Sequence, residues 1–456
     1  MKEAIKYYST NLNAEKITFR KALLKGLAPD RGLYMPEIIP QISISEIDSF
    51  SHMSYYDIAY MVMRKYLSTE LPDDIFYELV KDAYNFKIPL EKAYENKYIM
   101  RLDQGPTASF KDFAARMMGR LINYYLGLEN RQLIILTATS GDTGSAIANA
   151  FYGLNNIKLV VLFPKEEVTE RQRKQMTTLG KNIQVIAING KFDDCQALVK
   201  QAFSDHELEF LNLSSANSIN IGRLIPQMVY YFYAFSKLRS GKADDRITFS
   251  VPSGNFGDMM GGVLAMKMGL PVKKFIIATN ANDEFPKLLE TESYNKIEPS
   301  LNCISSAMNV GHPSNLARLV ALYGGNMDEK GFISKQPDYN ALRKEIYAVS
   351  ISDEVTRETI RQAYQKYNVL LEPHGAVGWA GLNHYIDKYP AENTAENLFV
   401  SLETAHPAKF PDEINKILNI LPALPSSLKN IEHKQEFILN VDNNYSAFKE
   451  FLKYSF

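Results

Sequence analysis

Short apolar runs alternate with helical patterns along most of the chain, and this alternation limits the fold more than any other feature. Each run has the length of a buried strand and is followed by a turn and a stretch of helical periodicity. Such an order predicts a parallel, doubly wound sheet covered by helices on both faces, an α/β fold. In that fold, ligands bind beyond the carboxyl ends of the strands. The runs are residues 131–138, 158–163, 182–188, 247–251, 273–280 and 396–403.

The N-terminal part of the chain has a different pattern. Residues 43–96 carry helical periodicity, so we expect a mostly helical N-terminal domain over residues 1–95, in which Thr18 caps a short helix that Gly26 ends. Residues 281–345 are irregular and predict loops with short helices, and residues 411–456 predict a helical, loop-rich tail. A chain of 456 residues has room for two or three domains.

Charge and cysteine content exclude several classes of protein. The formal net charge is −1, which argues against a nucleic-acid or anionic-membrane partner. Cys195 and Cys303 are too few for a disulfide framework or most cysteine metal sites, and they fit a reducing compartment. The N-terminus lacks the apolar core of a signal peptide, and residues 224–235 are too short and polar-flanked to span a bilayer. We therefore expect a cytoplasmic protein.

Familiar hydrolase and nucleotide motifs are absent. The sequence contains no HExxH, no GxSxG and no tight cluster of His, Asp and Glu, so neither a metal site nor a serine hydrolase is predicted. It also lacks GxxxxGK[ST] and GxGxxG, which disfavours a P-loop hydrolase and a dinucleotide fingerprint.

One lysine stands at a chemically favourable place. Lys111 follows a Gly-Pro-Thr turn and heads an apolar helical pattern, so packing holds it on one side and leaves it free on the other. A lysine amine that is partly desolvated loses proton affinity and becomes a nucleophile towards aldehydes. For any single lysine the alternative is an ordinary solvated residue, so the case for Lys111 depends on the other segments.

Three polar turns are candidates for binding anions. Residues 137–146, TATSGDTGSA, and residues 251–258, VPSGNFGD, each end a strand in small residues and open a helix, where free N–H groups bind a carboxylate or a phosphate. A phosphate fits the N–H groups of the second turn well. The third turn, residues 215–227, offers an arginine that can clamp a phosphate and a helix that Pro226 would start, although a capping cluster with a surface arginine explains it equally well. The residues concerned are Ser140, Thr143, Gly254, Asn255, Phe256, Gly257, Ser218, Asn220 and Arg223.

The end of the last buried strand adds a hydroxyl. Thr404 follows that strand and is able to hydrogen-bond a ring nitrogen. His406 and His374 are interpreted as structural histidines, the first because it precedes a proline and the second because small residues around it explain close helix packing.

These motifs together resemble threonine synthase, of the long subgroup with an N-terminal domain. GLAPDRGLYMP, GPTASFKDF, TATSGDTG, SANSINIGR, VPSGNFGD, EPHGAVG and TAHPAKF occur in the family's order, from about residue 18 to about residue 412. The resemblance implies a tryptophan-synthase-β-like fold (fold type II) with pyridoxal 5'-phosphate (PLP) as cofactor and two doubly wound parallel-sheet domains. Residues 96–245 would form the smaller domain and residues 246–456 the larger one with the tail. The resemblance to this subgroup also favours a monomer.

The resemblance also implies roles by position. Lys111 would bind the cofactor as a Schiff base, Thr404 would face the pyridine nitrogen, and Asp142 would lie near the 3-hydroxyl. The other expected cofactor ligands are Gly254, Asn255, Phe256, Gly257 and Asp258, around the cofactor phosphate. Ser140 and Thr143 would hold the substrate carboxylate, and the substrate phosphate would be held by Ser218, Asn220 and Arg223.

The implied reaction converts O-phospho-L-homoserine and water to L-threonine and phosphate by γ-elimination and β-addition of water. Two alternatives remain open. One is a related phospho-lyase that releases a 2-oxo acid, ammonia and phosphate, and the other is a cofactor-free binding protein on an α/β scaffold. Several positions depart from the family pattern and bear on substrate preference: Asp103, Gln104, Ala108, Ser109, Asn309 and Glu403.

Overall fold

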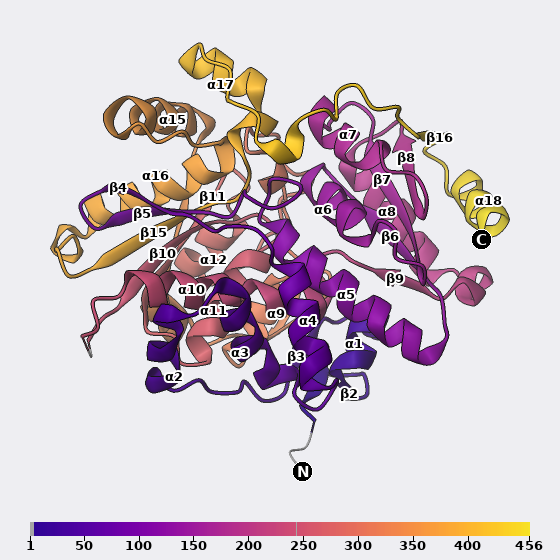
Figure 1. The fold of residues 1–456 in the computed structure, drawn as a ribbon, viewed down its shortest axis with the longest axis horizontal. Coiled ribbons are helices and arrows are strands. Elements are labelled where there is room, and N and C mark those ends of the chain that lie inside the picture. Colours follow the sequence, from indigo (N-terminus) through magenta and orange to yellow (C-terminus); the bar gives the residue numbers. More distant parts are fainter. Residues whose placement is uncertain (1–3, 243) are drawn as a thin grey trace.

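The computed structural model describes residues 4–242 and 244–456. Two sheets lie next to each other, each covered by helices, and the N-terminal helices lie along one side of both (Figure 1). All strands of the two sheets pair in parallel except one hairpin, so the predicted α/β fold is confirmed.

The larger sheet has six strands. Its strand order is β14-β11-β10-β15-β5-β4, and only β4 and β5 are antiparallel. In β11, Phe275 packs against Gly262 of helix α11 while the next residue, Ile276, packs against Gly381 of α16. Because successive residues of a strand face opposite sides, these contacts show that helices cover both faces. The bounds are β4 Leu90–Tyr94, β5 Lys97–Arg101, β10 Ile247–Pro252, β11 Val272–Thr279, β14 Ile346–Ser350, β15 Leu398–Glu403, α11 Gly257–Lys267, α15 Asp353–Tyr367 and α16 Pro373–Lys388.

The smaller sheet has five strands, all parallel, in the order β16-β8-β7-β6-β9. Strand β6 is buried along its whole length, as its apolar run predicts, and the helices that follow each strand return over the sheet. The bounds are β6 Leu133–Ala138, β7 Ile157–Pro164, β8 Ile183–Ile188, β9 Leu213–Ser215, β16 Leu439–Val441, α5 Lys111–Glu129, α6 Asp142–Phe151, α7 Glu170–Thr177, α8 Phe192–Ser204 and α18 Tyr445–Ser455.

The N-terminal domain contains the expected helices and, in addition, a small antiparallel sheet of order β2-β1-β3. The predicted caps are present: Thr18 accepts a hydrogen bond at the start of α1, and Gly26 ends that helix with φ 76°. Helix α3 packs on α10, and α4 packs on α5, so this domain touches both sheet units. The bounds are β1 Lys6–Ser9, β2 Ile17–Thr18, β3 Tyr34–Pro36, α1 Phe19–Lys25, α2 Ile44–Ser49, α3 Tyr55–Leu67, α4 Asp73–Ala83 and α10 Val229–Leu238.

One helix start differs from the sequence prediction. The helix after β9 begins at Ile221, where Asn220 caps it, and Pro226 lies inside this helix, α9 (Ile221–Gln227), instead of starting it. The side-chain oxygen of Asn220 accepts the N–H of Gly222 at 2.9 Å, so a cap inside the motif begins the helix before the proline.

Residues 281–345 contain loops and short elements, as predicted. They cross the carboxyl end of the larger sheet and supply the loop around Met308 that contacts the turn after β10. The bounds are α12 Glu284–Thr291, α13 Leu316–Leu322, β12 Asn326–Met327, β13 Ile333–Lys335 and α14 Tyr339–Glu345.

The pairing of strands crosses the predicted domain limits. Strands β4 and β5 come before residue 102 but belong to the six-stranded sheet, and β16 returns from the tail to the five-stranded sheet. The division at residues 95 and 245 stays a prediction about folding units, since sheet membership alone does not say what folds independently.

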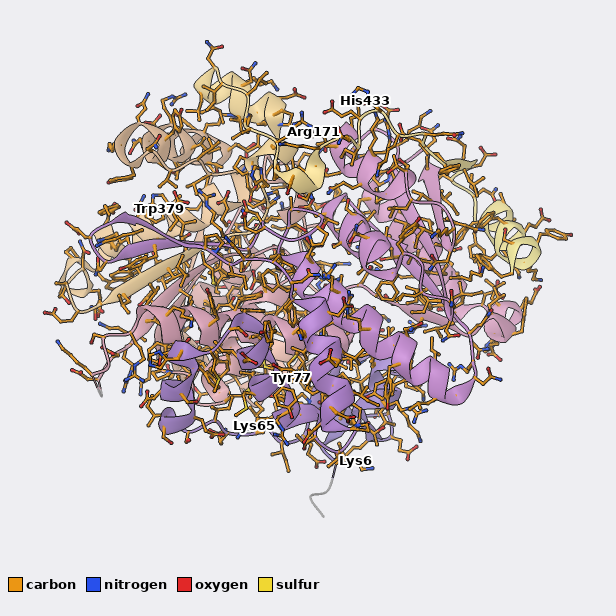
Figure 2. The ribbon with its side chains drawn as sticks, in the orientation of Figure 1. Lys6, Lys65, Tyr77, Arg171, Trp379 and His433 are labelled. Atoms are coloured by element: carbon orange, nitrogen blue, oxygen red, sulfur yellow. The ribbon has the colours of Figure 1, made fainter. Side chains whose placement is uncertain are left out.

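The tail forms a strap between the two sheet units. After α17 (Pro411–Leu418) the chain crosses α7, where the carboxylate of Glu436 accepts two hydrogen bonds from Arg173, both at 3.0 Å. Arg171 of α7 and His433 of the tail mark this crossing in Figure 2. Strand β16 then joins the edge of the smaller sheet and α18 packs on α8. Among the described residues, no helix combines the length and the apolar character needed to cross a membrane.

The last helix supplies a test of this docking. Phe448 of α18 is completely buried, whereas Tyr454 of the same helix is 88% exposed. Phe448→Ala should lower the free energy of unfolding by about 3–5 kcal/mol, because a large side chain leaves a packed site. Tyr454→Ala, the matched control, should change it by less than about 0.5 kcal/mol. Urea denaturation measures both, and equal effects would contradict docking of the tail on the smaller sheet.

Candidate active site

The predicted site residues follow strands of both sheets and meet where these strands end. The main-chain N–H of Phe110, next to Lys111, donates to the carbonyl oxygen of Thr404 at 2.8 Å. The side-chain nitrogen of Asn255 donates to the hydroxyl of Ser218 at 2.6 Å. These contacts join the turns after β5 and β15 and the turns after β9 and β10. The common rim follows from parallel strands, whose carboxyl ends share one edge.

Lys111 is the first residue of α5 and lies at the centre of this rim. Its side chain is half-buried, and its ammonium lies 4.6 Å from the ring centroid of Phe110. Asp112 secures the preceding turn by accepting both the N–H and the hydroxyl of Thr107, at 2.8 and 2.7 Å. Burial lowers the pKa of the Lys111 amine; Arg223 and Lys409 lower it further, while Asp142 and Glu372 oppose the shift. The nucleophile predicted from sequence therefore has a physical basis here.

Asp142 is paired with a lysine that the sequence analysis did not single out. One carboxylate oxygen, Oδ1, lies 2.6 Å from the Nζ of Lys409 and accepts the amide of Gln172 at 2.8 Å. Burial alone would raise the pKa of Asp142, but the ammonium groups of Lys409 and Lys111 and these hydrogen bonds hold it well below its usual range. Lys409 is the lysine of the TAHPAKF motif, and its place in this motif was the sequence signal that could have identified it.

The turn after β10 is built to receive an anion. Phe256 adopts a left-handed conformation, φ 60°, directly before the first residue of α11. The N–H groups of residues 254–257 donate to no acceptor in the part of the chain that the structure describes. A Cβ on Gly254 would lie 2.8 Å from the Cα of Met308, so only glycine lets the loop pack this closely. Consecutive free N–H groups at a helix start bind phosphate.

The side chains around that turn hold its shape. Asn255 uses its side-chain oxygen to accept the N–H of Ser314 at 2.6 Å, which ties the turn to the loop beyond it. Asp258 turns inward and accepts the hydroxyls of Tyr230 and Tyr231, at 2.5 and 2.7 Å. Burial raises the pKa of Asp258 to about 6, against the effect of both tyrosines. In this structure, Asp258 therefore contacts the protein interior, and contact with the cofactor stays a prediction.

The third turn presents a buried arginine with spare donors. Arg223 donates one hydrogen bond, to the carbonyl of Ala216 at 3.0 Å, and its Nε has no partner among the described residues. Burial lowers the pKa of its guanidinium to about 10. A buried, unpaired donor of this kind is expected where an anion binds.

Asn220 has a different place from the one predicted. Its amide nitrogen donates to the carbonyl oxygens of Leu23 and Ser215, both at 2.9 Å, and its oxygen caps α9. The side chain is thus committed to the main chain and connects the N-terminal domain to the turn. Its predicted contact with substrate phosphate is not visible in these interactions.

The turn after β6 leaves its own donors open. The hydroxyl of Thr139 accepts the N–H groups of Gly141 and Gly144, at 2.9 and 2.8 Å, and so shapes the start of α6. The N–H groups of Ser140, Asp142 and Thr143 donate to no acceptor within the described ranges. The side chains of Ser140 and Thr143 are half-buried and make no hydrogen bond there. This turn is a second place where an anion fits.

Thr404 faces a buried carboxylate that sequence analysis missed. Its hydroxyl donates to Glu372 at 3.3 Å, and Glu372 also accepts the N–H groups of His374 and Gly375, at 2.8 and 2.9 Å. The ring of His374 contacts the same carboxylate and accepts the N–H of Ala307 at 3.0 Å, so this histidine is structural, as expected. Glu372 begins the EPHGAVG motif, which was its signal in the sequence.

His406 is also structural. Its ring nitrogen Nδ1 accepts the N–H of Ala408 at 3.1 Å and caps the short turn that carries Lys409. Burial lowers the pKa of His406 to about 4, with Arg101 and Lys409 adding to the shift, so the ring is neutral at neutral pH. The interpretation of His406 as a structural residue agrees with these contacts.

The site fits a phosphorylated aldehyde cofactor. It combines an amine of lowered pKa at Lys111, a run of free N–H groups at residues 254–257 and a hydroxyl at Thr404. Comparison with known proteins defines the class. The family model "Pyridoxal-phosphate dependent enzyme" matches residues 87–397, which places the chain among the PLP-dependent enzymes of fold type II.

The remaining matches define the family. The models "Threonine synthase N terminus" and "Threonine synthase, C-terminal" match residues 6–84 and 375–452. Threonine synthase of Escherichia coli K12 is 38% identical over 93% of this chain and 94% of its own, and that of Saccharomyces cerevisiae is 34% identical over 96% and 95%. A solved PLP-bound threonine synthase from Brucella melitensis has a TM-score of 0.90 and 34% identity, covering 99% of both chains. This chain belongs to the threonine synthase family.

A buried carboxyl lies next to the turn after β10. Glu284 begins α12, and its neighbour Phe285 packs on Phe256 with ring centroids 5.0 Å apart. Burial raises the pKa of Glu284 to about 8, and Asp283 adds to the shift; the Oε2 atom has no partner in the described chain. Ionising Glu284 therefore costs the folded protein free energy.

This cost predicts a pH dependence. Because the folded pKa lies above the unfolded value, the free energy of unfolding should fall as pH rises from about 4.5 to about 8, and the loss is complete above that range. Glu284→Gln cannot ionise, so its free energy of unfolding should lack this pH-dependent loss. Between about pH 5 and about pH 9 the variant should therefore become more stable relative to the wild type. Urea denaturation at both pH values measures the difference. Parallel pH profiles of the two proteins would contradict the buried ionisation.

Proposed function

We propose that this chain converts O-phospho-L-homoserine and water to L-threonine and phosphate, with PLP bound at Lys111. The observation that carries the proposal is the set of three anion-binding turns around one amine of lowered pKa. The reaction needs three anion-binding sites, because the cofactor carries one phosphate and the substrate carries a phosphate and a carboxylate. A cofactor-free binding protein has no use for an amine held partly out of water.

The cofactor is assigned to the turn after β10. The N–H groups of Gly254, Asn255, Phe256 and Gly257 hold its phosphate, and Asp258 supports the turn from behind through its two tyrosines. Thr404 would face the ring nitrogen, and Asp142 would lie near the 3-hydroxyl, as the family resemblance implies. Bound there, the cofactor supplies an electron sink for the charge left when carbon loses a proton.

The substrate is assigned to the other two turns. Arg223 holds the substrate phosphate with its unpaired donors, beside the hydroxyl of Ser218. The free N–H groups and hydroxyls of Ser140 and Thr143 hold the substrate carboxylate. Asn220 acts indirectly, because its hydrogen bonds fix the turn that carries Arg223.

Lys111 carries the protons of the reaction. A neutral amine would accept a proton from Cα and then one from Cβ as phosphate leaves Cγ. Cγ then takes up a proton, water adds at Cβ, and Cα regains a proton, so that substrate and water give threonine and phosphate. Burial favours the neutral amine, which is the form that accepts a proton. The proposal further takes the chain as a cytoplasmic monomer acting on a small molecule, in line with its two free cysteines and near-zero charge.

Product identity tests the proposal. Purified protein loaded with PLP and supplied with O-phosphohomoserine should release threonine and phosphate in equal amounts, measured by amino-acid and phosphate assays. Lys111→Ala should lose both turnover and the visible absorbance band of lysine-bound cofactor. Release of mainly 2-oxobutanoate and ammonia would replace the proposal with the phospho-lyase, and a wild type without a band at saturating PLP would overturn both.

Arg223 gives a more specific prediction. Arg223→Ala should raise KM for O-phosphohomoserine by about 10–100-fold, because a charged hydrogen bond to phosphate is worth about 1.5–3 kcal/mol. The absorbance band should remain, since the cofactor phosphate binds another turn. Arg131→Ala, at an exposed arginine just beyond the end of α5, is the control and should leave KM unchanged. Loss of the band in Arg223→Ala would contradict the assignment of separate phosphate sites.

A further inference from the structure

Lys409 is a completely buried lysine, and no part of the mechanism above uses it. It lies in the turn after β15, where it forms the last residue of a short 3-10 helix, Pro407–Lys409. Its ammonium has two partners: Oδ1 of Asp142 at 2.6 Å and the carbonyl oxygen of Thr107 at 2.9 Å. A buried ammonium is costly unless it is paired and hydrogen-bonded, and these contacts supply a carboxylate and a carbonyl partner.

The charges around Lys111 come from several elements. Asp142 of α6 and Glu372 at the start of α16 favour a protonated Lys111, while Arg223 of α9 and Lys409 oppose it. Asp112 of α5 faces Lys409 and Arg223, and its pKa is raised to about 6, mainly by burial. Gln172 of α7 contacts Asp142 but is neutral. Asp142 is thus the carboxylate that two lysines share.

The pairing decides which lysine Asp142 neutralises. Its Oδ1 is taken by Lys409 at salt-bridge distance, whereas no hydrogen bond joins Lys111 to any described residue. If Lys409 were uncharged, a buried carboxylate would be left with only one cation nearby, and opposite charges in a buried site attract strongly. Lys111 would then be held as an ammonium, which is neither a nucleophile nor a base.

We propose that Lys409 is a positioning residue that occupies Asp142, so that this carboxylate does not hold Lys111 in its protonated form. The Asp142–Lys409 pair then presents a neutral polar unit beside the reacting amine. The inference rests on the proposed function only in taking Lys111 as the lysine that binds the cofactor. The contacts that carry it are independent of any ligand.

A charge-balance cycle of three variants tests this role. Lys409→Met removes the cation, Asp142→Asn removes the anion, and the double variant removes both. In the cofactor-free full-length chain, competitive acetylation over a range of pH, read by mass spectrometry of the Lys111 peptide, gives the pH at which half of the Lys111 amine is neutral. This readout needs neither cofactor nor activity.

The expected signs are distinct. Lys409→Met should raise the half-titration pH of Lys111 by about 1–3 units, because an uncompensated carboxylate lies nearby. The double variant should return it to within about half a unit of the wild type. Asp142→Asn should lower the half-titration pH of Lys111, because the ammonium of Lys409 would then act on Lys111 without the carboxylate. It should not raise that pH. Lys174→Met, which removes a lysine paired with Glu170 on the neighbouring α7, is the control and should have no effect.

The outcomes separate this inference from a purely structural role and from the proposed function. A Lys409→Met value equal to the wild type, or a double variant no different from Lys409→Met, would overturn the inference. If Lys409→Met does not fold, as judged by circular dichroism, a rise in Asp142→Asn would still refute it and a fall would support it. In the PLP-loaded protein, absence of the visible band in the wild type would refute the proposed function and leave the acetylation result valid.

Discussion

The structure depends on the convergence of strand ends from two parallel sheets. A chain of net charge −1 offers no overall positive charge to attract anions. Parallel strands bring main-chain N–H groups together because every strand ends at the same rim. The turns after β6 and β10 leave such groups open, and the turn after β9 adds Arg223. Lys111 lies where these turns meet, and burial there lowers the pKa of its amine.

The rim is held in place by segments that connect one part of the fold to another. Strands β4 and β5 precede α5, so the six-stranded sheet directly positions the turn before Lys111. The tail crosses α7, which carries Gln172, and then adds β16 to the smaller sheet. Asn220 ties the N-terminal domain to the turn of Arg223. Each of these crossings ends near a residue of the site, so the relative positions of the turns depend on contacts remote in sequence.

The sequence was sufficient to predict strands that are buried along their whole length. It was insufficient where a contact with a distant segment determines the local structure. Buried strands such as Leu133–Ala138 were predictable because almost every residue is apolar. Strands β4 and β16 were not, because LEKAY and LNV are short and partly polar and gain strand structure only by pairing with β5 and β8. The motifs identified the turns that meet at the rim, whereas the inward direction of Asp258 and the capping by Asn220 follow from tertiary partners. Lys409 and Glu372 were missed because charged residues are ordinarily exposed, and only the fold shows them buried and paired.

The departures from the family pattern also acquire a physical meaning. Glu403 and Asp103 are buried next to Arg101, and burial raises the pKa of both carboxyls. Oε1 of Glu403 accepts the N–H of Glu372 at 2.8 Å, and a Cβ on Gly375 would lie 1.7 Å from Oε2, so the side chain packs directly on the start of α16. Glu372 itself accepts hydrogen bonds from His374, Gly375 and Thr404 and is thereby saturated as a carboxylate. Glu403 thus contacts the main chain of Glu372, whose carboxylate accepts the hydroxyl of Thr404. The larger side chain before Thr404 packs on the start of α16, next to the carboxylate that the hydroxyl of Thr404 contacts.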